Sequence, residues 1–463
     1  MFKKNPSPLR AALITFIAIV FLSSLSGCKT KPFDISGTVL DQFGDPASGV
    51  SITADTETAV TDGDGKYSIK GLTKANSLVV PSKEGYLFNP SQASVSGPSS
   101  SVNFTMVPGP KGVGISDIDM GASFSAVLDT EGRVWMCGNN EYGVLGDGTN
   151  IDRLYWVRSA GLDQVVDISA GYGHIHALRS DGTVWGWGFA GSGRLGFSSP
   201  SLAVSNPTKI NSLSGIASIS AGDYHSVAVG NDGKVWAWGS NEAGQLGVGD
   251  TTPRSGPVQV VALSGVSIID ACAASNFTIA LSDDGKVWAW GENYYGQLGN
   301  GSTLSSSVPV QSGTLDDFVA ISASSSHCLA LRSNGEVWGW GSNGYGQADG
   351  KTTSNVLSPA KITISDMALG ISAGSLSSFI FVPSGVYAWG ANNSGQLGEG
   401  STLPRNVPVL SQNLSSMHMI ASNYSSCIAF STLGDLYAWG NNHKGQLCTG
   451  DNITRNSPAP IVW

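Results

Sequence analysis

Charged residues are scarce in this chain. Asp, Glu, Lys and Arg make up 13% of the 463 residues, whereas hydrophobic residues make up 41%. A disordered chain has the opposite balance, so the composition indicates one to three folded domains. Basic residues cluster nowhere beyond the N-terminus, and the formal net charge is -9. Because nucleic-acid binding needs clustered Lys and Arg, we expect no nucleic-acid partner.

Sequence motifs of catalysis are also missing. The chain has no Gly-x-Ser-x-Gly elbow, no phosphate-binding loop and no His-Glu-x-x-His motif. Three of its six histidines, His174, His225 and His327, recur at one position of a repeating unit. We expect them to make core or loop hydrogen bonds. The prediction is therefore no catalytic residue, no metal, no cofactor and no enzymatic activity, with a site built from scattered loop residues as the alternative.

The six cysteines form no Cys-x-x-Cys pair, which argues against a zinc site or a redox motif. Cys28 stands apart at the N-terminus. The other five are an odd number and cannot all pair within one chain, so we expect small buried thiols in strands and leave open whether any of them pair. These five are Cys137, Cys272, Cys328, Cys427 and Cys448.

The N-terminus predicts export. Lys3, Lys4 and Arg10 precede an apolar run over residues 11–22, which is too short for an ordinary membrane span. The run leads into Leu-Ser-Gly-Cys28, which resembles the bacterial lipobox. The resemblance implies that residues 1–28 are a lipoprotein signal peptide and that Cys28 is the lipid-attachment site. An ordinary secretory signal with a chance cysteine is the alternative.

The predicted lipid anchor implies a location. Several acyl chains would hold the protein stably at the membrane of the cell envelope. Lys29 stands where an Asp often marks retention at the inner membrane. In a cell with two membranes we therefore expect the outer membrane.

Residues 29–107 have short alternating segments separated by turns, a pattern typical of a β-sandwich. Their order resembles the carboxypeptidase regulatory-like family, which implies a small spacer domain. Asp62 and Asp64 suggest a calcium loop, but Lys66 occupies the fifth position, which needs an oxygen ligand, and Thr73 the twelfth, which needs Glu. We expect a polar turn there. Residues 108–112 form a linker.

From about residue 113 the chain repeats an apolar residue followed by aromatic-x-aromatic-Gly. The spacings between successive final glycines are 50, 51, 52, 50, 49 and 50 residues, because these glycines are Gly138, Gly188, Gly239, Gly291, Gly341, Gly390 and Gly440. One such unit is a sheet of about four strands, which can bury both faces only against its neighbours. We predict an all-β chain with a seven-bladed β-propeller over residues 113–463. Its last strand is expected to meet the first blade and close the ring.

The repeat carries Ala-Gly-x-x-His-Ser, Asp-Gly-x-Val-Trp-x-Trp-Gly and Gly-Gln-Leu-Gly segments. This pattern resembles the regulator of chromosome condensation repeat, over about 350 residues. The units depart from it at several positions, which we interpret as packing variation. Phe124, Phe277, Ser377 and Ser425 replace the histidine, Cys137 replaces a tryptophan, and Val144, Arg194, Ala348, Asp349 and Cys448 interrupt Gly-Gln-Leu-Gly.

Tyrosines stand in two sets of loops, after the Trp-Gly and after the Ala-Gly positions. A tyrosine combines an apolar ring with a hydrogen-bonding end, which suits contacts with a partner. Packing on adjacent loops is the alternative. The partner-binding candidates are Tyr142, Tyr172, Tyr224, Tyr294, Tyr295, Tyr345 and Tyr424.

These features predict a membrane-anchored scaffold that contacts a protein or another cell-envelope component through propeller loops. The resemblance offers two alternatives. A secreted bacterial inhibitor of β-lactamases has this repeat type, which suggests inhibition of an exported enzyme. Relatives in nuclei and cytoplasm suggest guanine-nucleotide exchange on a small GTPase.

Overall fold

The computed structural model describes residues 31–461, apart from residues 42–43, 75, 84–85, 90–91 and 109–112. The predicted signal peptide and Cys28 lie outside the described residues. The described chain is all-β, as predicted, with only three short 3-10 turns: η1 (Gly191–Gly193), η2 (Val261–Leu263) and η3 (Gln412–Leu414). Over this described part, no helix is both long enough and apolar enough to cross a bilayer.

Residues before the repeats form two four-stranded sheets, ordered β4-β1-β8-β6 and β3-β2-β5-β7. Inward-facing residues of both sheets, including Ile35, Ile52 and Phe104, make one apolar cluster. The Asp62 carboxylate accepts hydrogen bonds from the backbone N–H groups of Asp64 and Lys66, as in a turn. The strands are β1 (Phe33–Asp41), β2 (Ser51–Ala54), β3 (Glu57–Val60), β4 (Lys66–Leu72), β5 (Ser77–Ser82), β6 (Tyr86–Asn89), β7 (Ala93–Val95) and β8 (Phe104–Pro108).

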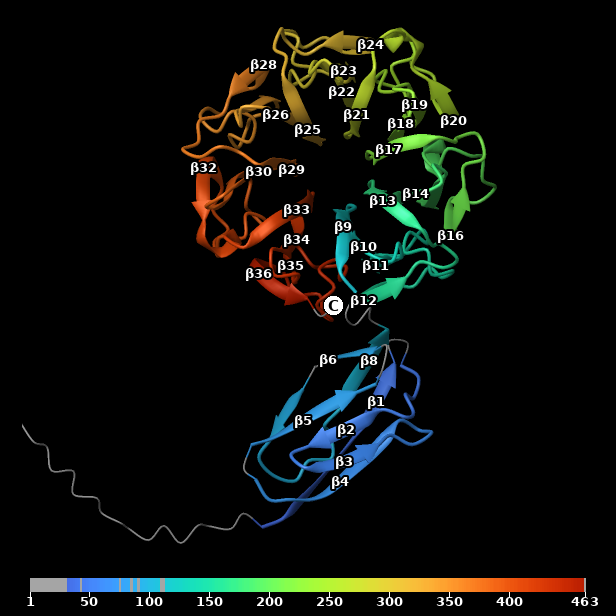
Figure 1. The fold of residues 1–463 in the computed structure, drawn as a ribbon, viewed down its shortest axis with the longest axis vertical. Helices are drawn as coiled ribbons and strands as arrows, with labels where there is room; N and C mark the ends of the chain where they lie inside the picture. Colours follow the sequence, from blue (N-terminus) through green and yellow to red (C-terminus); the bar gives the residue numbers. More distant parts are fainter. Residues whose placement is uncertain are drawn as a thin grey trace, which may run out of the picture.

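Seven further four-stranded sheets surround a central axis as the blades of a propeller (Figure 1). Blade 1 is β9 (Ile115–Met120), β10 (Phe124–Asp129), β11 (Val134–Gly138) and β12 (Arg153–Arg158). Blade 2 is β13 (Val165–Ala170), β14 (His174–Arg179), β15 (Val184–Phe189) and β16 (Ala203–Lys209), and blade 3 is β17 (Ile216–Ala221), β18 (His225–Gly230), β19 (Val235–Gly239) and β20 (Arg254–Gln259). Blade 4 is β21 (Ile268–Ala273), β22 (Phe277–Ser282), β23 (Val287–Gly291) and β24 (Ser306–Gln311), and blade 5 is β25 (Phe318–Ser324), β26 (His327–Arg332), β27 (Val337–Gly341) and β28 (Val356–Lys361). Blade 6 is β29 (Gly370–Ala373), β30 (Ser377–Val382), β31 (Gly385–Gly390) and β32 (Arg405–Ser411), and blade 7 is β33 (Met417–Asn423), β34 (Ser426–Ser431), β35 (Leu436–Gly440) and β36 (Arg455–Ile461).

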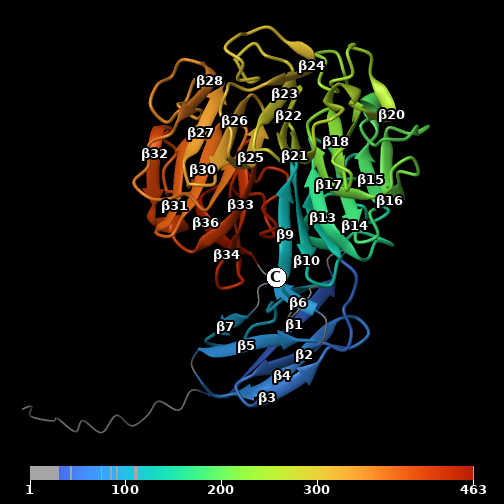
Figure 2. The same cartoon turned by 45° about the horizontal axis from the view of Figure 1, so that its top comes forward.

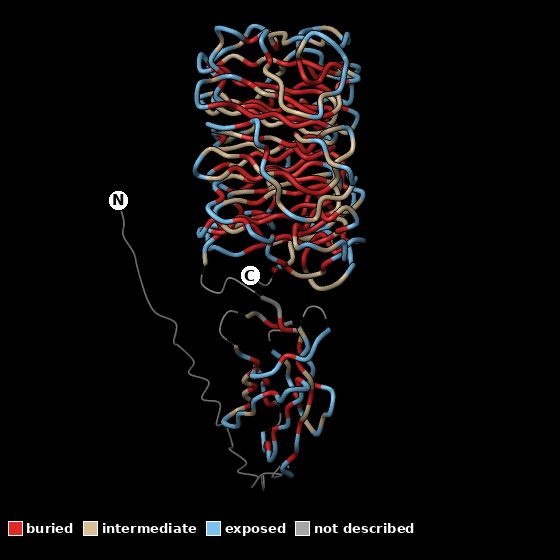
Figure 3. The backbone as a smooth tube through the Cα atoms, turned by 90° about the vertical axis from the view of Figure 1, so that its right-hand side faces the viewer, coloured by how far each residue is buried: buried red, intermediate tan, exposed pale blue. Residues whose placement is uncertain are grey.

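Each blade is an antiparallel meander, so its loops gather at two opposite ends of the propeller (Figure 2). Tight turns join the second and third strands at one end, which we call the hairpin end. The turn after the first strand and the loop after the third strand lie at the other, which we call the aromatic end. The chain enters blade 1 at the hairpin end, where the Thr130 N–H donates to the Gly114 carbonyl. Burial is concentrated in the strands and exposure in these loops (Figure 3).

Tryptophan joins each of blades 2 to 7 to the blade before it. The side chain of Trp290 is fully buried, and its Nε1 donates to the Gln245 carbonyl of blade 3 over 2.9 Å. The facing position in blade 3 favours glycine, because a methyl group at Gly247 would lie 2.7 Å from that Nε1 and the φ of Gly247 is +71°. Equivalent bonds come from Trp187, Trp238, Trp340, Trp389 and Trp439.

Blade 1 meets blade 7 differently. Cys137 stands at the tryptophan position of blade 1 and Cys448 at the glycine position of blade 7, and the two form a disulfide with a Cα–Cα distance of 5.8 Å. The expectation that both are free buried thiols is therefore wrong. They are 311 residues apart and no spacing motif links them, so only the ring geometry brings them together. Cys272, Cys328 and Cys427 are free, as expected.

The last strand does not extend the first blade. β36 pairs with β35 of its own blade, and among the described strands none pairs blade 7 with blade 1. Ile461 does contact the first blade, since it packs in one apolar cluster with Trp135 and Trp156. Side-chain packing and the disulfide, rather than a shared strand, join the two ends of the repeat array.

Candidate functional site

The seven innermost strands line the axis and are unusually one-sided in charge. Together β9, β13, β17, β21, β25, β29 and β33 contain four aspartates and no lysine or arginine. The four are Asp117, Asp119, Asp167 and Asp270. The axis is therefore an acidic channel.

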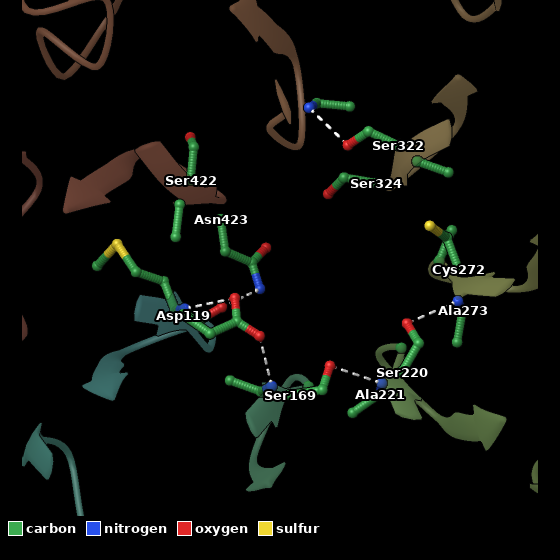
Figure 4. A pocket seen from close by; sticks show the side chains of 18 of the residues that line it. Asp119, Ser169, Ser220, Ala221, Cys272, Ala273, Ser322, Ser324, Ser422 and Asn423 are labelled. Carbon is green, nitrogen blue, oxygen red and sulfur yellow. Dashed lines mark hydrogen bonds between the residues drawn. The ribbon is translucent and has the colours of Figure 1, made fainter. Parts of the chain in front are cut away.

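A cavity of about 260 Å³ occupies this channel toward the aromatic end, lined by residues of all seven blades (Figure 4). Serine hydroxyls in its wall accept hydrogen bonds from the next blade, as Ser169 does from the Ala221 N–H and Ser220 from the Ala273 N–H. Asp119 takes the same place in blade 1 and accepts from the Ala170 N–H over 2.8 Å. The polar lining thus both holds the inner strands together and places a carboxylate at the cavity.

Burial raises the pKa of the carboxyl groups in the channel. Desolvation raises the pKa of Asp117, Asp119 and Asp167 to about 7 in each case. Repulsion adds to the effect, because Asp119 lies near Asp117 and Asp117 near Asp167. A positive charge placed in this channel would favour the ionised carboxylates and offset their mutual repulsion.

Three of the seven predicted tyrosines meet beside the cavity, although they come from blades 2, 3 and 7, and each directly follows a residue that lines it: Gly171, Asp223 or Asn423. The ring of Tyr172 stacks on Tyr224 with centroids 6.2 Å apart and meets the edge of Tyr424 at 5.7 Å. They remain accessible, with exposed fractions of 45% for Tyr172 and 37% for each of the other two. We call these three residues the tyrosine cluster.

Asp223 links the tyrosine cluster to the cavity. It lines the cavity wall, and its Oδ2 accepts a hydrogen bond from the Tyr424 hydroxyl over 3.2 Å. Burial raises the pKa of Asp223. The adjacent cation, Arg194, is buried behind Tyr224, with its guanidinium carbon 5.3 Å from the ring centroid and its Nη1 donating to the Asp223 carbonyl.

The backbone of Tyr424 is held in an uncommon conformation. Its φ is +50°, which non-glycine residues rarely adopt. Its N–H donates to the Ser375 hydroxyl and to Asn423 Oδ1, and Asn423 in turn donates to the Met120 carbonyl of blade 1. Three blades therefore fix the position of one exposed ring, and strain of this kind concentrates at functional sites.

The other predicted tyrosines lie at the same end, outside the tyrosine cluster. Tyr142 packs on Phe189, the last residue of β15 in the neighbouring blade, with centroids 4.5 Å apart, which is closer to the packing alternative than to the predicted partner contact. Tyr294 lines a second cavity of about 450 Å³, together with Glu242 and Glu292. Tyr295 is exposed in the same loop, and Tyr345 is half-buried in blade 5.

The repeat histidines make interblade hydrogen bonds, as the sequence suggested. The Nε2 of His225 lies 2.8 Å from Thr278 Oγ1, and that of His327 lies 2.9 Å from Ser378 Oγ. Burial lowers the pKa of His327 to about 4, so the ring is neutral at pH 7.

One assignment was wrong: Ser426, not Ser425, stands at the histidine position in blade 7, because it pairs with Gly440 as His225 pairs with Gly239. The turn before it has the usual length, because Ser426 follows Ile420 by six residues, as His225 follows Ile219.

Sequence reasoning missed the acidic half of the site. It noted Arg194 only as a departure from the repeat and did not single out Asp223 or the channel aspartates. A usable signal was present, since Asp117, Asp119, Asp167 and Asp270 stand on strands whose other polar residues are mostly serines.

Seven meander blades around a polar axis define a repeat-built β-propeller. The family model of the RCC1-like domain matches residues 50–316, and regulator of chromosome condensation (RCC1) repeat models match residues 318–347 and 384–429. The first match covers more than half of the chain, so the chain belongs to the RCC1-like domain family, which confirms the predicted repeat type. That match begins inside the two-sheet unit, although the blades begin at Ile115.

Curated relatives match only part of the chain. The ultraviolet-B receptor UVR8 of Arabidopsis thaliana is 39% identical over 139 residues, which are 29% of this chain and 31% of the receptor. A secretion-regulating guanine nucleotide exchange factor of Bos taurus is 31% identical over 198 residues, 41% of this chain and 39% of that protein. The chain thus spans less than half of either relative.

Solved structures agree on the fold. Prp20p of Saccharomyces cerevisiae superposes with a TM-score of 0.65 at 21% identity, over 72% of this chain and 87% of that one. Human WBSCR16 superposes with a TM-score of 0.63 at 21% identity, over 72% of this chain and 95% of that one. At this identity the likeness concerns the propeller alone.

Proposed function

We propose that this protein is a lipid-anchored scaffold of the bacterial cell envelope that binds a protein partner through the aromatic end of its propeller. The observation that carries the proposal is the tyrosine cluster, in which three blades place exposed rings of Tyr172, Tyr224 and Tyr424 against one another. Exposed aromatic rings grouped on a rigid frame are typical centres of protein interfaces. The proposal includes no catalytic step.

The path of the chain supports the choice of end. The chain enters blade 1 at the hairpin end, so the aromatic end lies on the side of the propeller away from the entry point. In the proposal, Cys28 carries the lipid and residues 29–107 form a sandwich of the carboxypeptidase regulatory-like type. That sandwich acts as a spacer and leaves the aromatic end free for a partner.

The disulfide supports an exported protein. Disulfides persist in oxidising compartments and are uncommon in the cytosol. The Cys137–Cys448 bond therefore agrees with the export signal predicted for residues 1–28. In a cell with two membranes, Lys29 favours the outer one.

Crosslinking on the intact envelope tests the partner. Cells carrying the wild-type protein should yield crosslinked peptides between the loops of Tyr172 and Tyr424 and one envelope protein. The Tyr172→Ala, Tyr424→Ala double variant should lose most of them, whereas Tyr345→Ala, at the same end but outside the tyrosine cluster, should not. Crosslinks confined to the hairpin end, or equal yields from both variants, would refute the proposed binding face.

The lipid anchor has its own test. Metabolic labelling with a clickable palmitate analogue should mark the wild-type protein and leave Cys28→Ser unlabelled. Membrane fractionation should then find the variant in the soluble fraction. Label retained on Cys28→Ser would show that the acyl chain is attached elsewhere.

Two narrower functions remain candidates under the same proposal. An exported hydrolase bound at the tyrosine cluster would be inhibited, and a panel of such enzymes tests this. Nucleotide exchange is suggested by the name of the bovine relative, and a nucleotide-release assay with a small GTPase tests that. The disulfide, which agrees with an exported protein, counts against the exchange reaction.

A further inference from the structure

The mouth of the axial cavity combines features that suit a cation. Tyr172, Tyr224 and Tyr424 offer aromatic rings, and the carboxylates of Asp223 and Asp119 line the cavity beneath them. We propose that this site receives a lysine or arginine side chain of the partner protein, as an aromatic-rimmed cation pocket. The inference deepens the proposed function, because it names the chemistry that the partner must present.

Aromatic rings and carboxylates recognise a cation by complementary means. The face of a ring carries partial negative charge and attracts an ammonium or guanidinium group within about 6 Å. A carboxylate accepts charge-assisted hydrogen bonds from the same group. Asp223 Oδ2 already accepts the Tyr424 hydroxyl, so an incoming N–H donor can share or take over that acceptor.

The charges around the pocket favour a cation and disfavour an anion. The seven inner strands contribute four aspartates and no lysine or arginine. Arg194 is the neighbouring cation, but it is buried and engaged by the carbonyls of Gly191 and Asp223. Its guanidinium therefore packs against the Tyr224 ring. Arg194 is not among the residues that line the cavity, whereas Asp119 and Asp223 are.

Size favours a single side chain. The cavity measures about 260 Å³, whereas sites for drug-sized ligands and cofactors measure roughly 300–1,000 Å³. Serine hydroxyls, including those of Ser169 and Ser220, make up much of its polar wall. An extended side chain with a charged end matches both the volume and the lining.

Peptide binding to the full-length protein tests the pocket without knowledge of the partner. The probes are a capped Gly-Lys-Gly peptide, its Gly-Arg-Gly counterpart, and a Gly-Lys-Gly peptide with an acetylated side chain, titrated by calorimetry or NMR. We expect dissociation constants of roughly millimolar size for at least one basic peptide. The acetylated peptide, which keeps the stem and lacks the charge, should bind at least tenfold more weakly.

Variants locate the binding. Asp223→Asn should weaken the basic peptide about tenfold, and Tyr172→Leu, which keeps apolar bulk without a ring, severalfold. Asp283→Asn, an exposed aspartate in a turn of the hairpin end, is the matched control and should bind as the wild type does. Equal binding of the acetylated peptide, or unchanged binding by Asp223→Asn with unchanged thermal stability, would overturn the proposal.

The two proposals fail in distinguishable ways. If envelope crosslinks depend on the tyrosine cluster but no basic peptide binds, the cation pocket is wrong and the scaffold function stands. If basic peptides bind as described but crosslinks do not depend on the tyrosine cluster, the pocket stands as a site and the proposed binding face is wrong.

Discussion

Six of the seven blade interfaces are built alike, and the seventh is not. In the six, a tryptophan of one blade donates to a carbonyl of the Gly-Gln-Leu-Gly segment in the preceding blade, as Trp290 does to Gln245. In five of them the ring also faces the glycine that ends the segment, whereas blade 5 has Asp349 at that end. At the seventh, between blades 7 and 1, the disulfide of Cys137 and Cys448 takes those two positions. A covalent bond thus takes the place of the tryptophan and its hydrogen bond at the one interface that no chain connection spans, beside the apolar cluster that Ile461 forms with Trp135 and Trp156.

The comparison explains two departures from the repeat at once. Cys137 and Cys448 each break the pattern, and each stands where its partner's departure leaves room. Cys448 even keeps the left-handed backbone of the glycine that it replaces, with a φ of +56° against +71° for Gly247. A side chain at this φ costs stability on its own, which the bond offsets.

The largest effect is expected from breaking an ordinary interface. Trp290→Ala removes a fully buried ring and its hydrogen bond to Gln245. Removal of such a side chain from a core costs about 3–5 kcal/mol. Denaturant unfolding monitored by circular dichroism measures the loss, with Trp288→Ala, at a less buried position of the same strand, as the control. An equal loss in both variants would contradict the special role of the interface.

Opening the seventh interface should cost somewhat less. The Cys137→Ala, Cys448→Ala double variant loses the disulfide, which closes a separation of 311 residues, and native disulfides typically contribute about 2–5 kcal/mol. Thermal unfolding with and without reductant measures it. Reductant should lower the Tm of the wild type and leave that of the double variant unchanged. A wild-type Tm insensitive to reductant, with the thiols shown to be free, would contradict this.

Rebuilding the seventh interface to match the other six should recover part of that loss. Cys137→Trp with Cys448→Gly restores the tryptophan and glycine found elsewhere. We expect unfolding stability between that of the double-alanine variant and the wild type, and no response to reductant. Each single substitution is the control and should be less stable than the pair, because a tryptophan without its glycine collides with the Cys448 side chain.

The smallest expected effect is the pH dependence that a repeat histidine adds to the stability of its interface. The pKa of His327 is lowered to about 4 by burial, from an ordinary 6.5. Its contribution to stability is therefore present above pH 6.5 and is lost as the pH falls toward 4. His327→Phe, which introduces the residue that Phe277 provides at the same register position, should flatten the stability curve between pH 6.5 and 4 by roughly 1 kcal/mol per pH unit.

The channel aspartates change folding stability with pH in the opposite direction to His327. The pKa of Asp117, Asp119 and Asp167 is raised to about 7, so their contribution is present below about pH 4 and is lost as the pH rises through 7. Comparing the wild type with His327→Phe at each pH isolates the histidine, because both proteins share the aspartates. Parallel curves for the two proteins would contradict the assignment.

The repeat architecture could be predicted because it is written in local, periodic signals. Alternating strands, Asp-Gly turns and the aromatic-x-aromatic-Gly segment recur at nearly constant spacing, and each reports a geometry that its neighbours within the chain decide. The serine at the histidine position of blade 7 is equally predictable, because Ser426 follows Ile420 by six residues, as His225 follows Ile219. The bond between Cys137 and Cys448 could not be predicted in this way, because the two stand 311 residues apart and only the closed ring makes them neighbours.

The candidate site was predicted only in part, for a related reason. Tyr172, Tyr224 and Tyr424 were each identifiable as loop tyrosines. They also share the turn after the Ala-Gly position, which separates them in the sequence from Tyr294 and Tyr345. Which of their rings touch depends on how blades 2, 3 and 7 are placed around the axis. Residues 252 positions apart in the chain, such as Tyr172 and Tyr424, come together only when the ring has formed.

The sequence by itself determined the number of blades, the β class and the glycines and tryptophans that their packing requires, because hydrophobic periodicity and turn chemistry act over a few residues. The tertiary structure alone decided which cysteines bond, which tyrosines cluster and which aspartates share a channel. Those properties depend on side chains placed around a common axis, where residues far apart in the chain become neighbours.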